Sequence, residues 1–357
     1  MKVLNRYFMH EVYSGTLLVF TALLVIFAFL DLVHQLESLG RGNYNLLYIL
    51  AYVGLQIPGR IYELFPIAAL IGSLYALVQL SSYSEITVMR VSGVSVLRIA
   101  LSLMRAGLLF VLLNFVIGEF IVPPSESLAS QLRIRALNSV VAQEFRSGLW
   151  LKDGTSYVNV KEVLPDSAFV GIRIYEFDQN NSLRAINFAR EGKYLKDNSW
   201  LLTHVEQTRF DASSTQVTRL PQAYWNSVLN PDMLSVLLVV PEQMSALTLY
   251  SYVQHLRENK QKTSRYEIAL WNKLIYPFAT LAMMLMALPF AFLQNRMGGI
   301  SGKVFSGVML GLTFHLLNRV FANLGVLQGW TPLVSAALPT LIIFLSAVSF
   351  LWWLERR

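Results

Sequence analysis

Long apolar runs with few charges recur along this chain, on both sides of a middle segment that has a different pattern. A membrane-spanning helix needs roughly 20 mostly apolar residues, and six runs reach about that length. The predicted spans are residues 12–36, 61–81, 96–122, 274–293, 304–326 and 333–354. Residues 44–58 are also apolar but end at Pro58-Gly59-Arg60, so we interpret them as an interfacial or tilted lead-in to the second span.

The middle segment, residues 123–265, regains charges and carries short runs of β-branched and aromatic residues between turn signals. This pattern indicates a β-sandwich, barrel or jelly roll rather than a parallel sheet. Residues 125–137 and 244–260 are predicted to be helices at its two ends. The predicted strands are 149–151, 157–163, 169–177, 183–189, 192–195, 199–208 and 215–220.

The chain therefore divides into helices one to three (1–122), a β domain with flanking helices (123–265) and helices four to six (266–357). Lysine and arginine accumulate in short loops on the cytoplasmic side of membrane proteins. Placing both termini in the cytoplasm and the β domain outside leaves Arg41 as the basic residue of the short outer loops. In this six-span topology the inner segments hold eight basic residues: Lys2, Arg6, Arg90, Arg98, Arg296, Lys303, Arg356 and Arg357. A seven-span alternative, which counts 44–58 as a crossing, is disfavoured because it would place Arg356 and Arg357 outside.

Composition supports the membrane assignment, since 54% of the 357 residues are hydrophobic and only 14% are charged, against roughly a quarter charged in soluble domains. The net charge of +7 fits basic cytoplasmic ends, and no nucleic-acid motif accompanies it. The absence of cysteine excludes disulfides and thiolate metal sites. The first apolar run is too long for a cleaved signal peptide, so it is predicted to be a retained helix.

Catalytic motifs do not emerge from the sequence. The stretch 298–303 is only superficially similar to a phosphate-binding loop, because Met297 and Val304 stand where glycine and serine or threonine are needed. The histidines show no zinc-type spacing, and no nucleophile elbow is present. We therefore expect a non-catalytic protein without a cofactor or metal of its own. Gly307 and Gly311 are predicted to form a close helix-packing face.

Charged residues at the outer ends of the spans are candidate site residues, because burying charge in hydrocarbon is unfavourable. Each could snorkel to the interface. Alternatively, the arginines could bind an anionic headgroup, since guanidinium groups hold phosphate with two parallel hydrogen bonds. The candidates are Asp31, His34 and Glu37 in the first span, Arg133 and Arg135 beyond the third, and Arg319 in the fifth.

Residues 84–95, between the second and third spans, are predicted to form a short amphipathic helix. Ser84 is the expected N-cap, Glu85 lies in the first turn, and Gly93 ends the helix. Ile86, Met89 and Arg90 fall on one face. Such a helix could lie on the lipid or dock into a groove of a soluble partner, and the pattern alone leaves both alternatives open.

Taken with this segment, the order of spans and several stretches resemble the LptF/LptG family, the permeases of the lipopolysaccharide-export ABC transporter. The resemblance covers essentially the whole chain. Three stretches resemble the LptG branch in particular, namely Gly148–Gly154, Phe65–Leu70 and Met283–Leu288.

The resemblance implies a bacterial inner-membrane subunit with a periplasmic jelly roll that pairs with an LptF-like permease. It also implies a cytoplasmic LptB ATPase dimer that binds the ATP, and delivery of lipopolysaccharide toward LptC and the LptA bridge. By this resemblance Glu85, with Ile86, Met89 and Arg90, contacts the ATPase, and Arg133 holds lipopolysaccharide phosphates.

One departure from the family is visible, because lysines of other members match Asp31, Glu37 and Ser38 here. Those contacts cannot be carried over, and we hypothesise that Arg319, with Arg41 and Arg133, takes up part of their role. The competing hypotheses are the paralogous LptF subunit, or an envelope protein that binds a lipid or a partner without driving transport.

Overall fold

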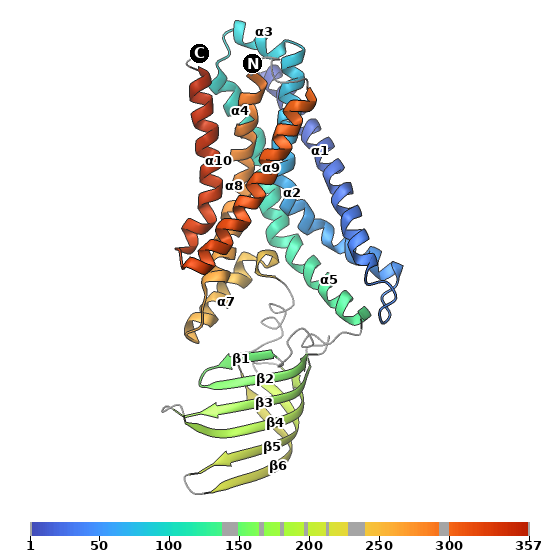
Figure 1. Cartoon of the computed structure of the whole chain (residues 1–357), viewed down its shortest axis with the longest axis vertical. Coiled ribbons are helices and arrows are strands. Elements are labelled where there is room, and N and C mark those ends of the chain that lie inside the picture. Colours follow the sequence, from blue (N-terminus) through green and yellow to red (C-terminus); the bar gives the residue numbers. More distant parts are fainter. Residues whose placement is uncertain are drawn as a thin grey trace.

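A computed structural model describes residues 2–137, 149–163, 168–178, 182–195, 199–211, 214–227, 240–292 and 300–355. A bundle of long helices stands at one end of a curved β-sheet (Figure 1). The bundle comprises α1 (Lys2–Leu36), α2 (Leu46–Ser82), α4 (Val96–Val116), α8 (Ser264–Phe292), α9 (Ile300–Gln328) and α10 (Pro332–Glu355).

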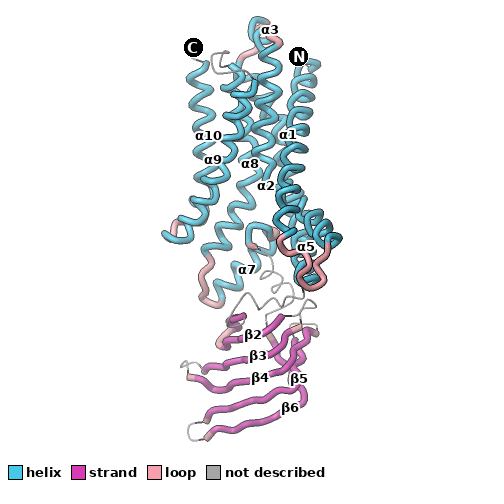
Figure 2. The backbone as a smooth tube through the Cα atoms, turned by 45° about the vertical axis from the view of Figure 1, so that its right-hand side comes forward, coloured by secondary structure: helices cyan, strands magenta, loops and turns pink. Residues whose placement is uncertain are grey.

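Among the described residues, six helical segments are long and apolar enough to cross a membrane. They coincide with the predicted spans in number and order, and they lie three before and three after the sheet in the chain. The ends of α1 and α10 lie beside the short helix α3 (Glu85–Val91), at the end of the bundle that faces away from the sheet (Figure 2). This arrangement matches the prediction that both termini and residues 84–95 share one side. Arg356 and Arg357, used in that prediction, lie outside the described residues.

The second span is the main correction within the bundle. Residues 46–58 belong to α2 itself, which continues through Pro58 and Pro66, so the lead-in and the span are one helix with no break at Pro58-Gly59-Arg60. Asn45 caps the helix by accepting a hydrogen bond from the backbone N–H of Tyr48 at 3.1 Å. At 37 residues, α2 is about 55 Å long, well beyond the roughly 30 Å of hydrocarbon. A single helix of this length supports six spans over seven.

The third span extends beyond its predicted end. A π-helical turn, η1 (Ile117–Ile121), joins α4 to α5 (Val122–Leu137) without a break, which confirms the predicted helix over 125–137. Gly118 in this turn lies against the ring of Tyr62, and a Cβ there would come within 2.5 Å of the ring. The extra residue of a π turn changes the face that the following helix presents.

Small residues set the close contacts of α2 with its neighbours. Gly72 lies directly against the backbone of Thr16 in α1, with no room for a Cβ. Gly307 and Gly311 of α9 face side chains of α2, and Ile67 lies 2.8 Å from the Cβ position of Gly311. The predicted glycine packing face is thereby confirmed. Most of the apolar stretch of α2 is buried, whereas almost none of α1 is.

The inserted domain is one antiparallel sheet in which each strand pairs with its neighbours in the chain. Seven strands were predicted, but 183–189 and 192–195 are parts of one strand, so the described residues form six. The strands are β1 (Leu149–Asp153), β2 (Ser156–Val163), β3 (Phe169–Phe177), β4 (Leu183–Tyr194), β5 (Ser199–Phe210) and β6 (Thr215–Asn226).

One face of the sheet carries its own hydrophobic core. The rings of Phe169 and Trp200 stack there with centroids 4.3 Å apart, and Val158, Val160 and Ile172 are fully buried. The sheet curves in Figure 1, and β6 is exposed along nearly its whole length. The all-β character of the insert is confirmed.

Candidate functional site

Five charged or titratable side chains from three helices form what we call the charge network: Asp31 (α1), Arg60 and Glu63 (α2), and His315 and Arg319 (α9). The Arg60 guanidinium donates to both oxygens of Asp31, at 2.6 and 2.7 Å, and to Glu63 at 2.9 Å. The other oxygen of Glu63 lies 3.5 Å from both His315 Nε2 and Arg319 Nη2. The network ties α1 and α9 to α2.

Exposure differs sharply across the charge network. The side chain of Asp31 is 14% exposed, whereas that of Arg319 is 68% exposed. A bidentate pair such as Asp31–Arg60 is among the stronger charge-assisted contacts. Arg319 has one long contact for its five N–H donors. Among the described residues it is therefore the most exposed arginine of the network and the one with the most unused donors for an anionic ligand.

Sequence reasoning identified Asp31 and Arg319 but not the two residues that connect them. Arg60 was interpreted only as the end of the apolar run 44–58, and Glu63 was not singled out, because only the fold brings these two residues between α1 and α9. Asp31 is taken up by Arg60, so its carboxylate is a structural partner rather than a free ligand. His34 and Glu37 are exposed and do not join the network.

Arg133 of α5 lies half-buried against α2. Its guanidinium carbon is 5.6 Å from the centre of the Tyr52 ring, and its Nε has no hydrogen-bond partner among the described residues. Two turns earlier on the same face of α5, the buried Glu126 places a carboxylate oxygen 2.5 Å from where a Cβ of Gly59 would be. Gly59 therefore allows α5 to approach α2 and hold Arg133 there.

Arg133 and Arg135 do not form one cluster, because residues two apart lie on different faces of a helix. Arg135 is exposed at the end of α5. The loop that carries the exposed Arg41 is joined to this end, since the Asn43 N–H donates to the Ala136 carbonyl at 2.8 Å. The fold thus places Arg41 close to Arg135 rather than to Arg319.

At the opposite end of the bundle, α3 ends as predicted. Gly93 has a φ of +85°, and the N–H groups of Gly93 and Val94 donate to the carbonyls of Arg90 and Met89, which is a Schellman ending. The predicted cap was wrong in detail, because Ser84 adopts a left-handed φ of 60° and its side chain makes no capping bond.

The faces of α3 also require a correction. Ile86 and Met89, which were predicted to lie on a docking face with Arg90, are buried against the bundle and hold α3 in place. Val88 and Val91 are 63% and 85% exposed. Glu85 accepts a hydrogen bond from the Tyr7 hydroxyl at 3.2 Å, and Arg90 lies over the ring of Phe292 at 5.7 Å. The exposed surface of α3 is therefore mixed: Val88 and Val91 are apolar, Thr87 and Arg90 are polar, and Glu85 is partly exposed.

A further polar junction links the bundle to the sheet through α7 (Ala246–Glu258), which follows the 3-10 turn η3 (Pro241–Gln243) and confirms the predicted helix over 244–260. Both carboxylate oxygens of Glu119, in η1, accept the Ala246 N–H, at 2.9 and 3.1 Å. After the far end of α7, Asn259 accepts the Gly154 N–H and the Lys152 ammonium, both at 3.2 Å. These contacts give the Lys152-Asp153-Gly154 turn a structural role.

Beside this junction, Lys273 of α8 is only 4% exposed. Its ammonium nitrogen lies 4.9 Å from the centre of the Tyr62 ring and has no hydrogen-bond partner among the described residues. Sequence reasoning missed Lys273, because it precedes the apolar run that was counted as the fourth span.

Comparison with known proteins gives one family. The family described as "Lipopolysaccharide export system permease LptF/LptG" matches residues 6–356. The lipopolysaccharide export system permease protein LptG of Escherichia coli K12 is 32% identical, over 99% of this chain and 98% of its own. The LptG protein of Haemophilus influenzae is 31% identical over the same shares of each chain. With its six apolar helices and inserted β domain, this chain belongs to the LptF/LptG family of lipopolysaccharide export permeases.

Proposed function

We propose that this chain is the transmembrane permease subunit of an inner-membrane ABC transporter that moves lipopolysaccharide toward the outer membrane. The full-length match to permeases named LptG carries the proposal, and it favours the LptG over the LptF subunit. The permease has no catalytic role of its own. ATP is bound and hydrolysed by a separate cytoplasmic ATPase dimer of the LptB type.

The substrate contact is the exposed part of the charge network. Arg60 and Glu63 hold α1, α2 and α9 together, and Arg319 presents its guanidinium from that scaffold. A phosphorylated glycolipid entering from the outer leaflet offers the doubly charged group that such an arginine binds with two hydrogen bonds. Arg133, with an unpartnered Nε against α2, is the second phosphate contact, and Arg41 and Arg135 lie farther out on the path.

The ATPase contact is α3. Val88 and Val91 enter a groove of the ATPase, while Glu85 and Arg90 form polar contacts at its edge. The buried Ile86 and Met89 fix the helix to the bundle, so that movement of the ATPase is transmitted to α2 and α4. The remaining partners are an LptF-like permease, LptC and the LptA bridge, which receives the lipid from the periplasmic sheet.

Co-purification tests the proposal against a lipid-binding envelope protein that lacks a transport motor. The chain is extracted in mild detergent from its own membrane, and the proteins bound to it are identified by mass spectrometry. We expect a stoichiometric ATPase and a second permease. Val91→Glu on α3 should release the ATPase. Val217→Glu on β6, where valine is 57% exposed, is the matched control and should retain it.

Lipopolysaccharide crosslinking tests the substrate contact. A photoreactive residue placed near Arg319 should capture lipopolysaccharide, and Arg319→Glu should remove most of that signal, because a carboxylate repels phosphate. Unchanged crosslinking in the Arg319→Glu chain would refute the contact. An extract that contains no ATPase would instead refute the transporter assignment as a whole.

A further inference from the structure

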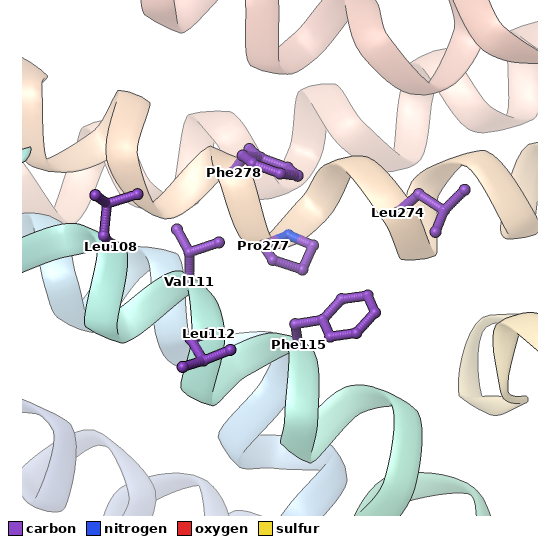
Figure 3. A pocket seen from close by; sticks show the side chains of 7 residues that line it. All are labelled: Leu108, Val111, Leu112, Phe115, Leu274, Pro277 and Phe278. Carbon is purple, nitrogen blue, oxygen red and sulfur yellow. The ribbon is translucent and has the colours of Figure 1, made fainter.

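An apolar groove runs between α4 and α8, away from the helices that carry the charge network. It encloses about 370 Å³, and it opens to the outside of the bundle, since Leu108, Leu112 and Phe278 are each more than half exposed. Figure 3 shows side chains of both helices pointing into it. The lining residues are Leu108, Val111, Leu112, Phe115, Leu274, Pro277 and Phe278.

Two arginines stand at the α3 end of this groove. Arg98 and Arg105 are seven residues apart on α4, which places them on one face, and Leu108 and Leu112 continue that face into the groove. Both arginines are exposed. Within the described residues, neither guanidinium has a hydrogen bond or an ion pair to another side chain.

The surroundings leave these arginines without an anionic partner on either helix. No aspartate or glutamate occurs along α4, and the only one in α8, Glu267, is paired with Arg257 at 2.8 Å near the opposite end. A helical side chain leans toward the N-terminus of its helix. The Arg105 guanidinium is thereby directed toward the α3 end of the bundle, while the groove lies deeper, about 5 to 15 Å along the helix axis.

We propose that this groove is a binding site for an anionic phospholipid of the leaflet at the α3 end, with the phosphate on Arg105 and Arg98 and one acyl chain between α4 and α8. The apolar lining fits a hydrocarbon chain, and the two unpaired guanidinium groups supply the charge that a phosphate needs. Basic pockets between membrane helices on the cytoplasmic side recognise lipid headgroups in this way. Under the topology of the proposed function, that leaflet is the cytoplasmic one, and the bound lipid is distinct from the exported glycolipid.

Lipid retention by the purified full chain tests the site. The protein in detergent is titrated with palmitoyl-oleoyl phosphatidylglycerol or with the phosphatidylcholine of the same acyl chains, and bound lipids are counted by native mass spectrometry. We expect phosphatidylglycerol to be retained at least fivefold better. Arg105→Gln should lower its retention by roughly fivefold, the contribution of one arginine near a membrane surface. Arg105→Lys should keep most of it.

Filling the groove separates this site from general charge attraction. Val111→Trp places a large ring in the groove and should abolish retention of both lipids. The control is Leu109→Trp, at a 44% exposed position of α4 that does not line the groove, and retention should be unchanged there. If the Val111→Trp chain fails to fold, the comparison of Arg105→Gln with Arg105→Lys still tests the proposed site.

Three results would overturn the proposal: equal retention of the two lipids, full retention of phosphatidylglycerol by Arg105→Gln, or equal losses in Val111→Trp and Leu109→Trp. Displacement of phosphatidylglycerol by lipopolysaccharide would assign the groove to the export path and would also refute it. None of these readouts depends on export, so they stand apart from a failure of the proposed function.

Discussion

The charge network of α1, α2 and α9 and the lysine of α8 both place charge within membrane-spanning helices, but they differ in pairing and in access. In the network, each carboxylate faces a guanidinium, and Arg319 is 68% exposed. Lys273 is 4% exposed and is in contact with an aromatic ring rather than a carboxylate. Exposure, rather than the presence of charge, therefore distinguishes a surface that can meet a ligand from a group that belongs to the internal architecture.

The charge network and Lys273 should respond differently when one positive charge is removed from each. Removing Arg60 leaves Asp31 without a cationic partner among the described residues and leaves Glu63 with only its long contacts to His315 and Arg319. Removing Lys273 takes away a cation that has no hydrogen-bond partner among the described residues. The two substitutions are therefore expected to change the stability of the bundle in opposite directions.

The largest effect is expected for Arg60→Met. The free energy of unfolding should fall by about 3 kcal/mol, which is the lower end of the loss seen when one partner of a buried ion pair is removed. Titration of the purified chain with a denaturing detergent measures the change. Arg135→Met, at an exposed arginine, is the control and should change stability by less than about 0.5 kcal/mol. Equal results for the two variants would contradict a structural role for the network.

Lys273→Met should act in the other direction. Removing a buried ammonium that lacks hydrogen bonds relieves its desolvation, while the contact with Tyr62 is lost. The expected net result is a gain of about 1.5 kcal/mol in the free energy of unfolding. The same detergent titration measures it. A loss comparable to that of Arg60→Met would show that the charge of Lys273 is well compensated and that the contrast is wrong.

Glu119→Ala tests the capped helix beside Lys273. Loss of the two contacts to the Ala246 N–H should lower stability by about 1 kcal/mol, as for other N-terminal caps. Hydrogen exchange should rise in the first turn of α7 and remain unchanged in α3. Glu119→Gln keeps one acceptor and should lose less. Unaltered exchange at the start of α7 in the alanine variant would count against the cap.

The smallest stability effect is expected for Arg319→Gln. Its contact with Glu63 is long and largely exposed, and such pairs contribute less than about 0.5 kcal/mol. Its crosslinking to lipopolysaccharide should nevertheless fall severalfold, since the positive charge and the fork of N–H donors are gone. A variant that loses stability as Arg60→Met does, yet keeps its crosslinking, would reverse the roles assigned to the two arginines.

The six spans could be predicted from the sequence because the bilayer requires long apolar runs. The ends of the helices could not be predicted in this way, because the helices continue beyond the last residue of each apolar run. The helix α8 begins at Ser264, ten residues before the predicted span, and Glu267 in its first turn is held by Arg257 of α7. This partner is provided by the fold and has no signal in local hydropathy.

The strand that was predicted as two has a local explanation. Alternation of buried and exposed residues breaks at Arg190 and Glu191 in β4, and it breaks at the facing positions 170 and 171 in β3. Gly171 has a φ of +67°, so both strands shift phase at the same place while their pairing continues. A sequence pattern records the shift but not the continued hydrogen bonding, and it therefore suggests a break.

Sequence alone predicted those parts of the candidate site that a single residue identifies, but not the pairs that depend on helix packing. Arg319 and Arg133 stand out as charges near spans, whereas the partners of Asp31 and Glu63 depend on which helices become neighbours. The short helix α3 was located correctly from its caps and glycine. Which of its faces is free could not be inferred, because Ile86 and Val88 are equally apolar and only the packing buries one of them.

The anchoring of α7 at both ends has a mechanical consequence. Thirteen residues make a rod about 20 Å long, pinned near η1 by Glu119 and near the first hairpin of the sheet by Asn259. A rod held in this way acts as a lever, so that a tilt of about 5° at the membrane end displaces the hairpin by about 2 Å. A tilt of α7 therefore moves the turn between β1 and β2 directly, through the contacts of Asn259 with Gly154 and Lys152.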